Sequence, residues 1–147
     1  MADKQAVTEL LNRAGVAYDI ADTDFLTNMF VDDGAQFHLT IAGGDVIPFD
    51  GKEAIGKLFT DSLTEQTDQR RHCITNIYFE NETDDAVTAV SYLVLITVEN
   101  GELKVVSSGM YTDGCVNVGG EWKIRKRRLD LDLPYWVFSH ILAEGVV

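Results

Sequence analysis

Four long segments in the second half of the chain alternate apolar and polar side chains with a period of two, and this pattern constrains the fold most strongly. The segments run over residues 71–80, 86–99, 102–113 and 121–132, and turn signals separate them at Thr83-Asp84-Asp85, Asn100-Gly101 and Gly119-Gly120. A period of two is typical of β-strands, and short turns join strands that run antiparallel. The pattern therefore predicts an antiparallel meander of four strands.

The first half of the chain predicts helices. Apolar residues recur at helical spacing from Asp3 to Tyr18, and Asp22 is placed to cap a second, short helix that ends near 32–34. A half-exposed strand is predicted over 35–42, which puts His38 on its polar side.

A third helix is predicted after a Gly43-Gly44 turn. Asp50 and Glu53 have the spacing of a capping box, and one apolar stripe follows them from Ile55 to Leu63. Helices first and strands after is the order of an α+β fold, not of a βαβ nucleotide-binding fold. With 147 residues, 46% hydrophobic content and no linker-like tract, we expect a single domain over 1–147.

The charge balance excludes several partners. The formal net charge of −12 argues against nucleic acid and anionic membrane surfaces, because phosphate binding needs a basic face. The basic run 123–128 lies in a predicted strand and is interpreted as a solvated edge. The N-terminus lacks a signal-like apolar core and no long apolar run occurs, so a cytoplasmic protein without a membrane span is expected. Cys73 and Cys115 are expected to be free thiols.

The second long strand is apolar on both faces, with residues such as Leu93 and Leu95 on one side and Tyr92 and Val94 on the other. Three helices can cover one face of the sheet, and a partner subunit would cover the other. We therefore expect a homo-oligomer, a dimer or a trimer. The apolar tail that follows Leu133 is expected to pack on the core, on a partner subunit, or over the mouth of the sheet as a lid.

Several short motifs follow one another along the chain: Tyr18-Asp19-Ile20-Ala21-Asp22, Phe25-Leu26, Met29-Phe30-Val31-Asp32-Asp33, Arg71-His72-Cys73-Ile74-Thr75-Asn76, Gly109-Met110-Tyr111-Thr112-Asp113, Trp122-Lys123-Ile124 and Arg127-Arg128. In the order and spacing of these motifs the chain resembles SnoaL-like proteins of the NTF2-like superfamily. The resemblance implies an NTF2-like cone, in which three N-terminal helices pack in a curved antiparallel sheet around an apolar pocket. It does not imply one function, since this fold serves both enzymes and non-catalytic subunits.

The resemblance also implies a catalytic pair. Scytalone dehydratase and hexachlorocyclohexane dehydrochlorinase share an Asp-His dyad, and Asp19 and His72 lie in matching contexts here. The dehydratase has a second histidine on the following strand, whereas Ser91 or Tyr92 is nearest in this chain, so that particular acid–base arrangement does not carry over.

Further residues are candidates for substrate binding. Tyr18 matches the tyrosine beside the dehydratase aspartate, and Arg127 falls where the dehydrochlorinase is expected to place a pocket arginine, although a single strand bulge would turn Arg128 inward instead. The remaining candidates are Tyr111, as a hydrogen-bond donor or pocket wall, and Phe30 and Tyr92, as pocket wall.

These residues predict a cofactor-independent lyase or isomerase that acts on a small apolar or aromatic molecule, cyclic or polyketide-like. A carboxylate that holds one imidazole nitrogen leaves the other free to accept a proton. Three scattered histidines with no HExxH or facial-triad pattern indicate no metal, and no activated nucleophile is evident. The alternatives are a non-catalytic binding or assembly subunit, like the β subunit of ring-hydroxylating dioxygenases, and a hydrolase that activates water.

Overall fold

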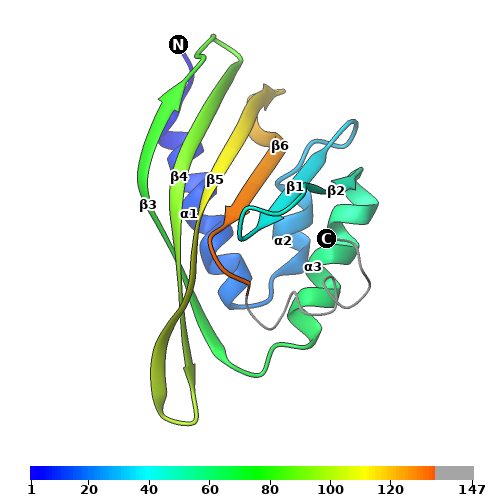
Figure 1. The fold of residues 1–147 in the computed structure, drawn as a ribbon. Helices are drawn as coiled ribbons and strands as arrows, with labels where there is room; N and C mark the ends of the chain where they lie inside the picture. The colour runs from blue at the N-terminus through cyan, green and yellow to red at the C-terminus, as the bar shows by residue number, and fades with distance from the viewer. Residues whose placement is uncertain (135–147) are drawn as a thin grey trace.

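The computed structural model describes residues 1–134, beginning with helices and ending in a long meander of strands (Figure 1). The helices are α1 (Lys4–Asp19), α2 (Thr23–Asn28) and α3 (Lys52–Thr64). Asp3 caps α1, and Asp22 caps α2 as predicted. The carboxylate of Asp3 accepts from the backbone N–H of Ala6, and that of Asp22 from the backbone N–H of Phe25, each at 3.0 Å. These caps fix where α1 and α2 begin.

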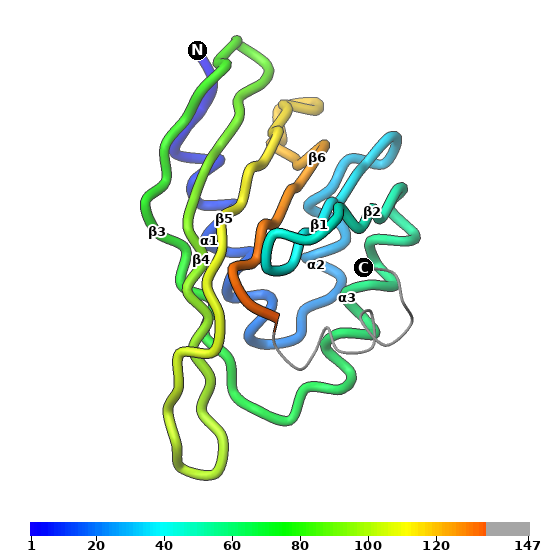
Figure 2. Tube along the Cα trace, in the orientation of Figure 1, coloured from blue at the N-terminus to red at the C-terminus, as the bar shows by residue number. Residues whose placement is uncertain are grey.

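Six strands form one curved, mixed sheet in the order β2-β1-β6-β5-β4-β3. They are β1 (Gln36–Ile41), β2 (Ile47–Asp50), β3 (Gln69–Glu80), β4 (Ala86–Glu99), β5 (Glu102–Val118) and β6 (Glu121–Leu131). The predicted antiparallel meander is present as β3 to β6. β1 lies beside β6 and runs parallel to it, although the two are far apart in sequence (Figure 2).

Two local features differ from what the sequence predicts. β2 was not expected, and it contains Pro48, which the sheet tolerates because β2 is an edge strand. The capping box of Asp50 and Glu53 does not form: Asp50 ends β2, and its carboxylate accepts from the Gln36 amide at 3.3 Å. Gly51 is the N-cap of α3, at a φ of 93° that disfavours side chains.

The helices cover one face of the curved sheet (Figure 1). α1 packs against β3, and α3 packs against β1 and β2, so the core fills the space between helices and sheet. The N-terminus lies beside the β3–β4 turn, where the amino group of Met1 pairs with Asp84. The α+β class and its three N-terminal helices are therefore confirmed, with one parallel strand pair added to the predicted antiparallel sheet.

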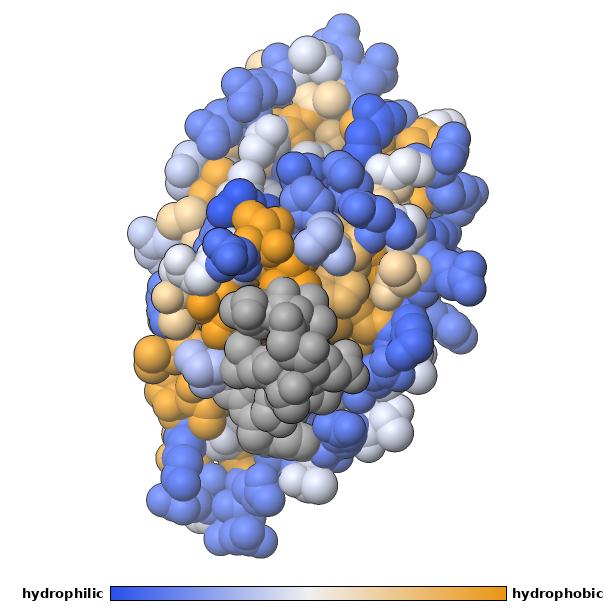
Figure 3. Space-filling view, turned by 45° about the vertical axis from the view of Figure 1, so that its right-hand side comes forward, coloured by the Kyte–Doolittle hydropathy of each residue, from blue (hydrophilic) through white to orange (hydrophobic). Residues whose placement is uncertain are grey.

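The opposite face of the sheet carries exposed apolar side chains. Tyr78 is 54% exposed and Tyr92 is 47% exposed, and the stripe continues along the β4–β5 hairpin through Leu103 and Val105. Figure 3 shows hydrophobic residues just above the hydrophilic tip of this hairpin, at the lower left. The predicted role of the tail that follows Leu133 concerns residues 135–147, which lie outside the described residues.

Candidate active site

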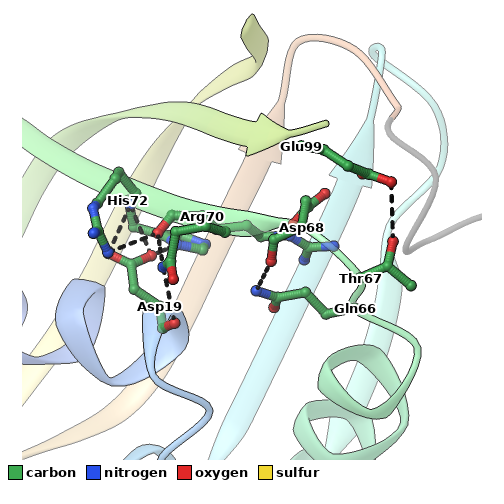
Figure 4. A network of polar contacts seen from close by, with 9 residues as sticks. Asp19, Gln66, Thr67, Asp68, Arg70, His72 and Glu99 are labelled. Atoms are coloured by element: carbon green, nitrogen blue, oxygen red, sulfur yellow. Dashed lines mark hydrogen bonds and ion pairs between the residues drawn. The ribbon is translucent and has the colours of Figure 1, made fainter. Parts of the chain in front are cut away.

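Asp19 and His72, predicted as a pair from positions more than fifty residues apart, contact each other directly. Asp19 is the last residue of α1, and its Oδ1 lies 2.7 Å from Nδ1 of His72 on β3 (Figure 4). The same carboxylate accepts the backbone N–H of His72, at 3.0 Å from Oδ1 and 3.2 Å from Oδ2. The side chains are only 8% and 4% exposed. Because a carboxylate accepts, Nδ1 carries the proton and Nε2 keeps its lone pair.

A glycine in α1 permits this contact. Gly15 lies one helical turn before Asp19, and a Cβ added there would lie 3.0 Å from the carbonyl oxygen of His72 and 3.3 Å from Cγ1 of Ile74. A larger residue would push α1 away from β3. The absence of a side chain at Gly15 therefore sets the distance at which Asp19 meets His72.

Burial lowers the pKa of His72, because the charged imidazolium would lose its hydration. Asp19 acts in the opposite direction and stabilises the proton, whereas the positive charges of Arg70 and Arg127 lower the pKa further. The net direction is downward. His72 is therefore neutral near pH 7, which is the state that a general base requires.

Tyr18 lies against the imidazole. Its ring stacks on that of His72, with centroids 4.7 Å apart and planes 18° apart, and it meets Phe59 edge-on at 5.6 Å. Burial raises the pKa of Tyr18, while the charge of Arg127 opposes that shift. The hydroxyl therefore stays protonated at neutral pH and is available as a donor.

Arg127, not Arg128, faces the inside of the sheet. Its Nε donates to Oδ1 of Asp113 at 2.8 Å and its Nη2 to Oδ2 at 3.3 Å, and neither residue has exposed surface. The guanidinium carbon lies 3.8 Å from the centroid of the Tyr111 ring. Burial opposes the charge of Arg127, but Asp113, Tyr111 and Tyr18 outweigh it, so the pKa of Arg127 is raised. Its Nη1 has no hydrogen-bond partner among residues 1–134.

One predicted pocket residue, Tyr92, is placed elsewhere. Tyr92 lies on the outer face of β4, because Ser91 and Leu93 on either side of it point inward and are buried. Its predicted place in the pocket is therefore not supported by the structure. Phe30 is fully buried in the aromatic core, with ring centroids 6.5 Å from Phe37 and 6.2 Å from Phe59.

Sequence reasoning missed two buried acidic partners. Asp113 stands directly opposite Arg127 in the β5–β6 register, a pairing that only the register itself reveals. Arg70 is 2% exposed, and its Nε donates to Oδ1 of Asp68 at 2.8 Å. Figure 4 shows Arg70 beside His72 on the same strand. The inner face thus carries three acid–base pairs.

The described part of the chain contains no cluster of three or more histidine, cysteine or acidic side chains able to hold a metal ion. None of the helices within residues 1–134 is long and apolar enough to cross a membrane.

Comparisons with solved structures place this chain in the class of proteins with a cystatin-like fold. A protein of unknown function from Nostoc punctiforme PCC 73102 with this fold is 27% identical, with a TM-score of 0.72 over 90% of this chain and 94% of that one. A protein from Catenulispora acidiphila, in complex with S-DNPA, is 24% identical, with a TM-score of 0.72 over 95% and 96%. A protein from Novosphingobium aromaticivorans DSM 12444, assigned as the β subunit of an aromatic-ring-hydroxylating dioxygenase, is 19% identical, with a TM-score of 0.77 over 89% and 90%.

Within that class, the model of the SnoaL-like domain matches residues 1–128. The chain belongs to the SnoaL-like domain family, as its motifs indicated. No curated protein matches the chain.

Proposed function

We propose that this protein is a cofactor-independent lyase or isomerase in which His72 removes a proton from a small cyclic substrate. The proton would lie next to a carbonyl, hydroxyl or halide group. One observation carries the proposal: Oδ1 of Asp19 lies 2.7 Å from Nδ1 of His72, and both side chains are almost fully buried.

In this mechanism Asp19 does three things. Through Nδ1 it fixes the tautomer and the orientation of the His72 ring, through the backbone N–H of His72 its carboxylate is held against β3, and its charge stabilises the imidazolium that forms when Nε2 takes a proton. The depressed pKa of His72 keeps the base free at neutral pH. General-base catalysis of this kind contributes about 100- to 10,000-fold in rate.

The pair Asp113–Arg127 supplies electrostatic stabilisation of the charge that develops on the substrate. Removing a proton next to a carbonyl leaves negative charge on the oxygen, and a buried, preorganised donor stabilises that charge at little reorganisation cost. Arg127 is such a donor, because Asp113 and Tyr111 hold its guanidinium while Nη1 stays without a described partner. The hydroxyl of Tyr18 is a further donor beside the imidazole.

The test is hydrogen–deuterium exchange into carbonyl compounds. Wild-type protein in deuterated buffer is incubated with a panel of small cyclic and aromatic ketones, and deuterium uptake next to the carbonyl is measured by mass spectrometry. We expect exchange to fall at least 100-fold in His72→Gln and to be unchanged in His38→Gln, which removes a histidine on β1. Exchange that survives in His72→Gln refutes the role of His72.

The alternative is an assembly subunit, in which Asp19 only ties α1 to β3 through the backbone N–H of His72. The two roles differ in what they require. The structural role needs only the carboxylate of Asp19 and the backbone N–H of His72, not the imidazole. His72→Gln would therefore leave the function of an assembly subunit intact. A wild-type chain that exchanges no ketone of the panel would favour this alternative.

We also propose that a second copy of this chain covers the outer face of the sheet. Leu103 and Val105 are 67% and 66% exposed there, on a stripe that includes Tyr92. Light scattering at micromolar concentration is expected to give a dimer or trimer, and Tyr92→Glu combined with Leu103→Glu is expected to give a monomer. A monomeric wild-type protein would contradict this proposal.

A further inference from the structure

Ser91 is a buried hydroxyl that no part of the mechanism above uses. It lies on β4, has no exposed surface, and its Oγ has no hydrogen-bond partner among residues 1–134. Its neighbours Ala89 and Leu93 belong to the core, so Ser91 shares their inward direction. A buried hydroxyl without a partner costs stability, and an alanine would fill the same site without that cost. A bound ligand is one way to satisfy it.

The same face holds a second donor of this kind. Ser91 stands directly opposite Tyr111 in the β4–β5 register, and the guanidinium of Arg127 lies over the ring of Tyr111. Ser91 lies on β4 and Arg127 on β6, and these two strands flank β5, which carries Tyr111. Each of the two residues has an atom without a hydrogen-bond partner among residues 1–134, Oγ of Ser91 and Nη1 of Arg127. The ring between them offers a flat apolar surface.

The charges around these donors favour a neutral ligand. Arg127 is already paired with Asp113 and Arg70 with Asp68, and Asp19 adds a carboxylate beside a neutral His72. These described groups sum to one negative charge, in a chain of formal net charge −12. An anionic ligand would be desolvated there without a free cation to neutralise it, whereas a neutral carbonyl oxygen needs only the two donors.

We propose that Ser91 and Arg127 together bind the oxygen-bearing end of a neutral, flat carbonyl ligand, and that the site rejects the matching carboxylate. This inference rests on the proposed function, because it names the class of ketone from which His72 would take a proton. Ser91 is here a binding residue that determines specificity. The carbonyl oxygen to which it donates becomes negative only when His72 removes the proton from the ligand.

The experiment measures affinity with three probes of similar shape. They are 2-acetylnaphthalene, a neutral ketone; 2-naphthoate, its carboxylate counterpart; and 2-ethylnaphthalene, which lacks the oxygen. Wild-type protein is expected to bind the ketone most tightly and the carboxylate at least tenfold more weakly. A carboxylate that binds as tightly as the ketone, or a ketone that binds no better than the hydrocarbon, overturns the proposal.

Variants separate a binding role of Ser91 from a structural one. Ser91→Ala is expected to weaken ketone binding by about two- to tenfold, the value of one neutral hydrogen bond, and to leave the hydrocarbon unaffected. Its melting temperature should stay the same or rise. Ser107→Ala is the matched control, because this buried serine donates to the carbonyl oxygen of Leu133 at 2.9 Å. It should lower the melting temperature and keep the preference for the ketone.

A loss of melting temperature in Ser91→Ala with an unchanged preference for the ketone would show that Ser91 is structural and that the proposal is wrong. Binding is also measured in His72→Gln, where it should persist because neither proposed donor is altered. Ketone binding without deuterium exchange in wild type would therefore contradict the function of His72 and leave the binding site standing, whereas exchange without a preference for the ketone would do the reverse.

Discussion

Two buried acid–base pairs on the same sheet face differ in almost every physical respect. Asp19–His72 joins the end of a helix to the edge strand β3 and uses one of two ring nitrogens. Asp113–Arg127 joins two neighbouring strands in the middle of the sheet, directly opposite each other, through two hydrogen bonds. The imidazole of His72 has a pKa that burial lowers from its ordinary value, so it is neutral near pH 7, whereas the guanidinium of Arg127 stays charged there.

The difference shows how one fold can assign separate tasks to similar chemistry. A guanidinium locked against a carboxylate cannot take a proton, so Asp113–Arg127 is suited to hold a fixed charge and a fixed donor. An imidazole with a depressed pKa and one carboxylate partner is suited to move a proton. We therefore expect that damage to Asp113–Arg127 affects stability most and that damage to Asp19–His72 affects activity most.

Asp19→Asn should have the largest effect on activity. Asparagine keeps the shape and can still accept the backbone N–H of His72, but it removes the charge that stabilises the imidazolium. We expect ketone exchange to fall by about 100- to 10,000-fold while the melting temperature changes little. Asp22→Asn is the control, since Asp22 only caps α2. Equal losses of exchange in both variants would contradict a specific role for Asp19.

Asp113→Asn should have the largest effect on stability. It leaves the buried guanidinium of Arg127 without its counter-charge, which costs about 3–5 kcal/mol. Urea denaturation measures this loss. Glu9→Gln is the control, because Glu9 pairs with Arg13 at 3.3 Å on the exposed side of α1, where such pairs contribute at most about 1 kcal/mol. Similar losses in the two variants would mean that burial does not distinguish these pairs.

Gly15→Ala should have a smaller effect that reaches both properties. The added methyl group presses on the backbone of β3, and such overpacking costs about 1–3 kcal/mol. Because the contact lies one turn from Asp19, exchange should fall as well. Gly56→Ala on α3 is the control, since its Cβ would meet the side chain of Thr27, nearest atom 3.3 Å away. A Gly15→Ala variant with full exchange activity would show that the spacing of α1 and β3 does not matter for the pair.

The smallest predicted effect is on acid stability. The pKa of His72 is lower in the folded protein than in the unfolded chain, so the unfolded chain binds this proton more readily. The stability that results is complete above about pH 6.5 and is lost as the pH falls toward the folded value, by at most about 1.4 kcal/mol per pH unit. The unfolding free energy of wild type relative to His72→Gln should therefore decrease on acidification. A difference that increases instead would contradict the direction of the shift.

The sequence predicted the meander and the helices well because each rests on a local period. The short strand β2 was missed because four residues that include Pro48 carry no period of their own. The contact of Asp19 with His72 was predicted only through the resemblance, since no local pattern relates a helix end to a distant strand.

The inward faces were harder to predict. Both sides of β4 are apolar, so its pattern does not indicate that Tyr92 lies on the outer side. Alternation alone does not decide whether Arg127 or Arg128 faces inward, because a bulge reverses it, and the β5–β6 register does shift between Gly114 and Cys115. The pairing of Asp113 with Arg127 depends on that register and follows from the three-dimensional structure alone.

Whether Asp19 holds His72 as a free base is measured most directly by nitrogen-15 NMR of the His72 imidazole, assigned by comparison with His72→Gln and followed through a pH titration. At pH 7 we expect a proton on Nδ1 and none on Nε2, with a pKa below the ordinary value of about 6.5. A proton on Nε2 at pH 7, or a pKa above that value, would contradict the proposal that Asp19 holds His72 as a free base.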